Sequence, residues 1–258
     1  MKLKEIAQII EEVAPLGYAS SWDNVGLMVG DLDCDVKKVM LTLDVTPDVV
    51  CQAVKENCSL IISHHPFIFE SIKAIDFSSA QGKMFKELIQ NNINVYSCHT
   101  NMDSAEGGIN SHLAKMFELE DVVVLEENEK FDGVGIGRVG KLKNTVTLEW
   151  LANHTKKLLN TPFVKVVGEL SKSIQCIAVA SGSCGDLISL AKEKGADAII
   201  TADVKYHQAL EAKENGICVI DAGRFPTETF VVEILKDILN NTNLEIVCAK
   251  ADDCFYVI

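Results

Sequence analysis

The chain has few of the features that mark membrane, zinc-ribbon or disordered proteins. None of its apolar runs reaches the roughly 18 residues that a membrane-spanning helix requires. Its nine cysteines include no CxxC pair, which argues against a zinc ribbon or a thioredoxin-type site, and we expect them to be buried thiols. Because prolines are few and long polar tracts are lacking, we expect the whole chain to fold.

Positive charge is also scarce. The 258 residues include 24 lysines and arginines but 37 aspartates and glutamates, so the net charge is −13 and the isoelectric point is about 4.9. A surface of this charge repels phosphate backbones and anionic lipids. We therefore expect no nucleic-acid or membrane partner, and the odd number of cysteines favours a reducing, cytoplasmic location.

Two segments of the chain resemble each other. "VMLTLDVTPDVVCQAVKENCSLIISHHPF" begins at residue 39, and "CIAVASGSCGDLISLAKEKGADAIITADVKYH" begins at residue 176. Both read as strand, helix and strand, and the apolar runs are typical of a parallel sheet covered on both faces. Residues 61–63 align without a gap with residues 199–201, and a second helix and a short strand follow in each copy. This repeat predicts an α/β protein of two related halves.

The expected domains follow from the repeat. The acidic run at 126–129 indicates an exposed linker, so we place the second domain at residues 126–225. The last helix and strand, near 227–240 and 244–249, have no counterpart in the middle of the chain. We assign them to the first domain, residues 1–125 plus 226–258. In this domain Thr46 and Pro47 are placed as the N-cap and the first residue of a helix.

Polar side chains follow the predicted strands of both halves. Ligands of open parallel sheets collect at the carboxyl ends of the strands, so we expect these residues to meet in a cleft between the halves. Imidazoles and carboxylates without thiolates are the usual ligands of zinc, iron(II) or manganese(II). The residues are His64, His65, His99 and Asp103, then Asp203, His207, Asp221 and Glu228.

The double histidine in "LIISHHPFIF" (60–69) has two interpretations. Adjacent residues of an extended loop point in different directions, so each histidine would bind one of two ions about 4 Å apart. Alternatively, one histidine caps the strand and the other lies on the surface. Similar polar clusters at the equivalent strand ends favour the metal site.

Several motifs, spread over almost the whole chain, together resemble one known family. They are "SWDNVGLMVG", "LTLDVTPDVV", "IISHHPFIF", "CHTNMDSAEGGIN", "GIGRVG", "ITADVKYHQALEAKENGICVIDAG" and "TE". Their order is that of the GTP cyclohydrolase 1 type 2 homologue family, also called the NIF-three-like family, in its short form without an inserted domain. The resemblance implies two α/β domains facing one another across a metal-binding cleft, one or two divalent ions per chain (Zn, Fe or Mn), and a ring-shaped homohexamer.

The resemblance also implies roles for individual residues. His64 and His65 would each bind one metal, and Asp103 and Glu228 would be carboxylate ligands, one of them bridging. If the protein is a metal-dependent hydrolase, our own hypothesis is that Glu228, Asp103 or His99 accepts a proton from a metal-bound water.

The early turn "SWDNVG" matches the family's WDN motif, so Trp22, Asp23 and Asn24 would contact substrate, although such residues also shape turns. "GIGRVG" (135–140) formally matches GxGxxG. No helix begins directly after it, so we expect a bend at a strand edge rather than a dinucleotide site.

One position departs from the family pattern. A histidine ligand usually follows "DAG", four residues before the glutamate, but this chain has Arg224 there. A guanidinium stays protonated and cannot coordinate a cation. Three alternatives follow: His99 or His207 replaces the ligand, Arg224 takes the place of the second cation and binds a phosphate or carboxylate of the substrate, or Arg224 forms a salt bridge with the carboxylates.

The function that these observations favour is a metal-dependent hydrolase with a small-molecule substrate, and the family name points to a nucleotide- or pterin-like ring. A different class fits the same residues: a non-catalytic metal-binding ring scaffold, or a metal-handling or regulatory protein. A third hypothesis is a nucleotide-binding regulator that uses Arg224 and Arg138 on phosphates.

Overall fold

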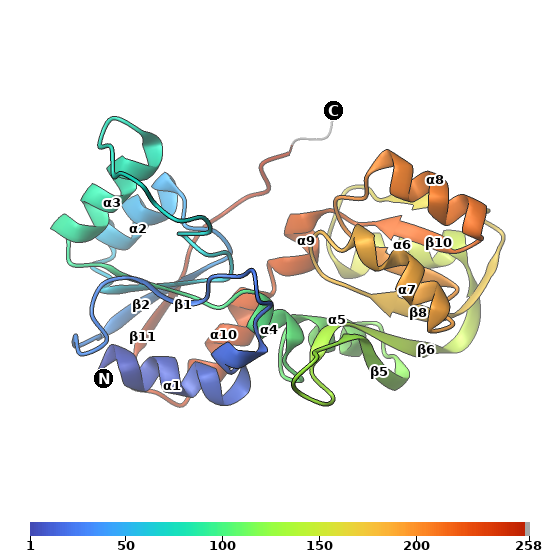
Figure 1. The fold of residues 1–258 in the computed structure, drawn as a ribbon, viewed down its shortest axis with the longest axis horizontal. Helices are drawn as coiled ribbons and strands as arrows, with labels where there is room; N and C mark the ends of the chain where they lie inside the picture. The colour runs from blue at the N-terminus through green and yellow to red at the C-terminus, as the bar shows by residue number, and fades with distance from the viewer. Residues whose placement is uncertain (256–258) are drawn as a thin grey trace. The chain divides into compact units, whose positions relative to one another are not determined.

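The chain folds into two compact α/β units, described by a computed structural model for residues 1–255 (Figure 1). The first unit is Met1–Met102 with Val231–Cys254, and the second includes Asp103–Phe230. The predicted boundaries after residues 125 and 225 are therefore shifted. Segment 103–125 belongs to the second unit because its helix α5 (Ile109–Met116) packs on that unit's sheet and its strand β5 (Glu120–Glu127) is part of it.

The first unit has a five-stranded sheet in the order β1-β4-β3-β2-β11. Its strands β2, β3, β4 and β11 are parallel, and β1 pairs antiparallel with β4. The pairing of β11 with β2 confirms that the end of the chain returns to the first half. The strands are β1 (Gly26–Val29), β2 (Lys38–Thr42), β3 (Leu60–Ser63), β4 (Asn94–Ser97) and β11 (Glu245–Cys248).

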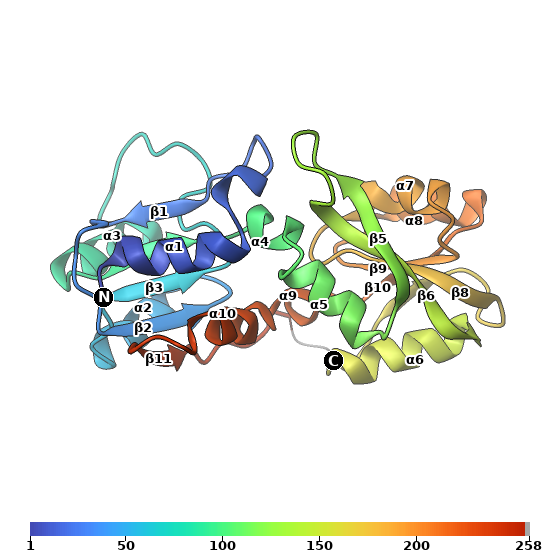
Figure 2. The same ribbon diagram turned by 90° about the horizontal axis from the view of Figure 1, so that it is seen from below.

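Helices cover both faces of this sheet. Helices α2 and α3 lie together on one face, while α1 and α10 lie together on the other (Figures 1 and 2). Short helical turns, η1 (Leu16–Tyr18) and α4 (Thr100–Ser104), lie in the connections. The longer helices are α1 (Leu3–Val13), α2 (Pro47–Lys55), α3 (Ala80–Gln90) and α10 (Val231–Leu239).

The second unit has a six-stranded sheet in the order β5-β6-β8-β9-β10-β7. Alternate residues of its central strands face opposite layers: Ile177 and Ile200 pack with α5 and α6, while Ala178 and Ile199 pack with α7 and α8. The remaining elements are β6 (Gly135–Thr147), α6 (Leu148–Leu158), β7 (Lys165–Val167), β8 (Ser173–Val179), η2 (Gly185–Leu187), α7 (Ile188–Glu193), β9 (Ala198–Thr201), α8 (Tyr206–Asn215), β10 (Cys218–Asp221) and α9 (Arg224–Glu228).

The predicted repeat is confirmed. In the first unit β2, β3 and β4 are adjacent, parallel and joined through α2 and α3; in the second, β8, β9 and β10 are joined in the same way through η2–α7 and α8. The aligned residues 61–63 and 199–201 lie in the central strand of each copy. The helix cap is also confirmed, since the Thr46 side chain accepts a hydrogen bond from the Val49 N–H and Pro47 is the first residue of α2.

The cysteines are all free thiols, but not all are buried as expected. Cys58, Cys98 and Cys218 are buried, whereas Cys51 and Cys254 are exposed. Burial raises the pKa of the Cys58 thiol to about 11. None of the helices in residues 1–255 is both long enough and apolar enough to cross a bilayer.

This difference in exposure is testable by alkylation. At pH 8 we expect iodoacetamide to modify Cys51 and Cys254 within minutes and to leave Cys58 intact, because a thiol with its pKa near 11 is only about one-thousandth thiolate there. Peptide mass spectrometry measures the sites, and urea-unfolded protein, in which all thiols react, is the control. Equal rates in the folded protein would contradict the burial of Cys58.

Candidate metal centre

Three histidines gather at the carboxyl ends of two neighbouring strands of the first unit. His64 and His65 directly follow β3, and His99 follows β4. Since these strands are adjacent and parallel, the segments after them begin at the same edge of the sheet. One ring nitrogen of each histidine lies within 4.8 Å of the other two, and the ring centroids are 5.0, 5.1 and 5.5 Å apart.

Each imidazole is oriented through its Nδ1 atom. Because carbonyl and carboxylate oxygens only accept hydrogen bonds, all three Nδ1 atoms carry the proton. This is the usual arrangement of metal-binding histidines, since it fixes the ring and makes Nε2 the coordinating atom. The Nδ1 atoms donate to the carbonyl oxygen of Cys98 (His64, 2.9 Å), to Oδ1 of Asp44 (His65, 2.7 Å) and to Oδ1 of Asp23 (His99, 2.9 Å).

The Asp23 carboxylate is held firmly behind His99. Its side chain is fully buried, and its Oδ2 accepts both from the Thr100 N–H at 3.0 Å and from the Thr100 hydroxyl. Burial raises the pKa of Asp23, but the hydrogen bonds from His99 and Thr100 outweigh it and hold the pKa below its usual value. Asp23 therefore stays ionised and makes His99 a stronger ligand for a cation. The sequence suggested contact with substrate; the structure places this carboxylate against His99.

The other residues of the WDN turn lie around the same cluster. Asn24 Nδ2 donates to the carbonyl oxygen of Ile68 at 2.5 Å and so joins the turn to the loop that follows the double histidine. Trp22 is 62% exposed, and its ring meets the His99 ring edge-on at 6.2 Å. The turn therefore places the Asp23 carboxylate against His99 and leaves the Trp22 ring exposed to solvent.

The two predicted carboxylate ligands belong to the second unit, where both contact the turn after β8. Asp103 Oδ1 accepts from Ser181 Oγ at 3.2 Å. Glu228 Oε1 lies so close to Gly182 that a Cβ atom placed on this glycine would be only 2.1 Å from it. Gly182 also has φ +68°, so a side chain is excluded there by the backbone and by the glutamate. Asp103 and Glu228 are 8% and 3% exposed.

Arg224 pairs with this buried glutamate. Its Nε is 3.3 Å from Glu228 Oε2, one turn along α9. The salt-bridge alternative is thus present in the structure. His99 joins the other two histidines in the first unit, whereas His207 is exposed in the first turn of α8 and joins no such cluster among the described residues. Asp203 is exposed, and Asp221 pairs with Lys165 Nζ at 2.6 Å.

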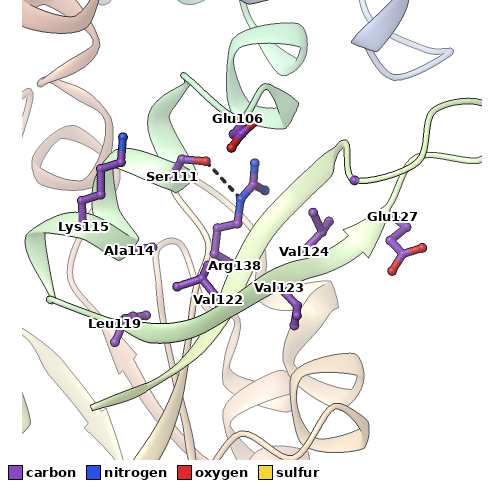
Figure 3. A pocket seen from close by; sticks show the side chains of 11 residues that line it. Glu106, Ser111, Ala114, Lys115, Leu119, Val122, Val123, Val124, Glu127 and Arg138 are labelled. Carbon is purple, nitrogen blue, oxygen red and sulfur yellow. Dashed lines mark hydrogen bonds between the residues drawn. The ribbon is translucent and has the colours of Figure 1, made fainter. Parts of the chain in front are cut away.

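Arg138 has a structural role. It lies within β6, paired with strands on both sides, and is 4% exposed, so "GIGRVG" is part of an inner strand rather than the expected bend at a strand edge. All five guanidinium N–H groups donate within the protein, so none remains for a phosphate, and the hypothesis that Arg138 binds nucleotides is wrong. Its side chain reaches towards Ser111 beside a pocket of about 470 Å³ (Figure 3). The acceptors are Ser111 Oγ and the carbonyl oxygens of Ser104, Ala105, Gly135 and Gly137.

Comparison with known proteins agrees with this architecture. The family model described as Duf34/NIF3 (NGG1p interacting factor 3) matches residues 1–254. The chain belongs to this family. It is 40% identical to a GTP cyclohydrolase 1 type 2 homolog of Clostridium acetobutylicum over 229 residues, 88% of this chain and 85% of that protein. It is 36% identical to the protein of the same name from Clostridium perfringens, with 99% of each chain covered.

A solved structure has the same fold. The crystal structure of the Staphylococcus aureus hypothetical protein SA1388 matches with a TM-score of 0.92 at 30% identity, over 100% of this chain and 99% of that chain. The resemblance deduced from the ordered motifs is therefore confirmed, as is the α/β fold.

Sequence reasoning missed Asp44, which orients His65. Replacing Asp44 by Asn removes the charge behind His65, and loss of such a partner typically lowers metal affinity by about 10- to 100-fold. We expect this loss for zinc, measured by competition with a chromophoric chelator. Asp48→Asn is the matched control, because Asp48 is an exposed acid of α2. Equal affinities of Asp44→Asn and the native protein would show that Asp44 does not support the site.

Proposed function

We propose that this protein is a metal-dependent hydrolase in which His64, His65 and His99 hold one divalent ion. The observation that carries this proposal is that a carbonyl or carboxylate orients each of the three clustered imidazoles through Nδ1. Three nitrogen donors without a thiolate fit zinc, iron(II) or manganese(II). Three protein ligands with an open fourth position are typical of catalytic rather than structural zinc sites.

Residues around the histidine cluster and the two buried carboxylates would have separate roles in the reaction. A bound ion of this kind supplies a water of lowered pKa and polarises the scissile group. Asp23 and Asp44 keep His99 and His65 in the required tautomer. His99, expected from the sequence to accept a proton, is assigned here to the ligand set. Asp103 and Glu228 then remain our candidates for the proton acceptor, because both are buried carboxylates.

We propose one firmly held ion rather than two because Glu228 already has a cationic partner. The Arg224 guanidinium lies against its carboxylate, and two unit charges about 4 Å apart repel one another by roughly 1 to 4 kcal/mol between the dielectric limits of water and a protein surface. A metal on the same carboxylate would face this repulsion. The Arg224 side chain is 45% exposed, which supports its expected role in binding an anionic group of the substrate.

The names of the curated relatives, GTP cyclohydrolase 1 type 2 homolog, support a nucleotide- or pterin-like substrate. The ring-shaped homohexamer and the cytoplasmic location stay predictions.

Metal content tests the proposal directly. By plasma mass spectrometry of tag-free protein we expect one ion per chain, its loss in His65→Ala, and a rise towards two in Arg224→His, which replaces the guanidinium by an imidazole. His207→Ala, which removes an exposed histidine, should keep the ion. Two tightly held ions in the native protein would contradict the effect of Arg224. No ion after soaking with zinc, manganese and iron(II) would overturn the hydrolase.

Turnover separates the hydrolase from the non-catalytic scaffold. We expect the protein to hydrolyse members of a panel of phosphoesters and cyclic amides, with the products measured by chromatography. A chelator should abolish this activity, and added metal should restore it. Stoichiometric metal that exchanges freely with no turnover of any panel member would instead favour a metal-handling protein.

A further inference from the structure

Two large aromatic rings lie exposed at the edge of the histidine cluster. Trp22 is 62% exposed and Phe69 is 53% exposed, although rings of this size usually bury most of their surface. Their centroids are 6.0 Å apart with an interplanar angle of 59°, and the Trp22 ring also meets the His99 ring at 6.2 Å. The two rings thus form an open, tilted pair next to one of the three imidazoles.

The pair is held in place by the segments that carry it. Asn24 Nδ2 donates to the carbonyl oxygen of Ile68, so the segment two residues beyond Trp22 is bonded to the residue before Phe69. On one side Asp23 is fixed by Thr100 and His99; on the other, Phe67 is buried against Phe85 with their ring centroids 4.7 Å apart. Both backbones are therefore anchored while the rings remain open to solvent.

We propose that Trp22 and Phe69 form a platform on which a flat heteroaromatic ring of the substrate stacks beside His99. The inference rests on the proposed function and specifies its substrate class. Stacking needs only an accessible π-face, which both side chains offer, and the indole N–H, with no hydrogen-bond partner among the described residues, is available to an acceptor on the ligand. The two side chains are uncharged, so they offer no cation to bind an anionic group, and the net charge of −13 also disfavours an anion. An uncharged aromatic ring is therefore the better ligand for this platform.

Tryptophan fluorescence tests the platform. The chain has two tryptophans, and the second, Trp150, lies in α6 of the other unit, stacked on His154. In a Trp150→Phe background, Trp22 is the only reporter. We expect guanosine to quench its emission saturably and ribose, which lacks a ring system, to leave it unchanged. Removal of one stacking side chain by Phe69→Ala should raise the dissociation constant about 5- to 100-fold.

The controls distinguish the platform from nonspecific hydrophobic binding. Phe77→Ala removes another exposed ring of the same connection, 54% exposed, and should leave the dissociation constant unchanged. By calorimetry, Trp22→Phe should retain most of the binding and Trp22→Ala should lose it. Equal weakening by Phe77→Ala, equal quenching by ribose, or no saturable quenching by either guanosine or thymidine would overturn the platform.

Chelator-treated protein separates this inference from the metal proposal. We expect guanosine to bind the metal-free protein as well, since stacking on Trp22 and Phe69 does not require an ion. Ring binding in a protein that takes up no metal would overturn the hydrolase and leave the platform standing. Full metal content without ring binding would overturn the platform and leave the hydrolase proposal standing.

Discussion

The parallel pairing of β3 with β4 is the constraint on which the candidate metal centre depends. Ser63 pairs with Ser97 at the ends of these strands, and their hydroxyl oxygens are 2.8 Å apart. Because the strands end in register, the segments that follow them emerge side by side. Cys98 can then offer its carbonyl oxygen to His64, and the next residue adds the third imidazole. Two segments 34 residues apart thus form one cluster.

Charge is arranged differently in the two units, although both use the ends of equivalent strands. In the first unit, carboxylates stand behind the imidazoles: Asp44, just beyond β2, orients His65, and Asp23 orients His99. Such a cluster presents nitrogen donors backed by negative charge, which favours a cation. In the second unit, the Glu228 carboxylate already faces the Arg224 guanidinium. The repeated scaffold therefore carries two different chemistries, because the loops and not the strands decide them.

Some features were readable from the sequence because they depend on local pattern. The apolar runs and the repeat predicted two related halves with parallel central strands, and the lack of a repeat partner predicted that β11 returns to the first sheet. The antiparallel strands β1, β5, β6 and β7 at the edges of this parallel core lie outside the repeat. The first domain boundary was wrong because segment 103–125 has no copy elsewhere, and its place depends on packing of α5 and pairing of β5. Arg138 was misjudged because glycine neighbours resemble a loop, whereas β6 continues through them.

By itself, the sequence determined the fold class, the family and the positions of the histidines at strand ends, since periodicity and motif order are properties of the chain. Only the tertiary structure decided which groups act together. Asp44 and His99 are distant from His65 in sequence, and they meet it because β2, β3 and β4 end at one edge of the sheet. Asp23 meets His99 because the WDN turn packs at the same place. The exposure of Trp22 and the pairing of Arg224 with Glu228 were decided in the same way, because contacts between side chains depend on packing in three dimensions.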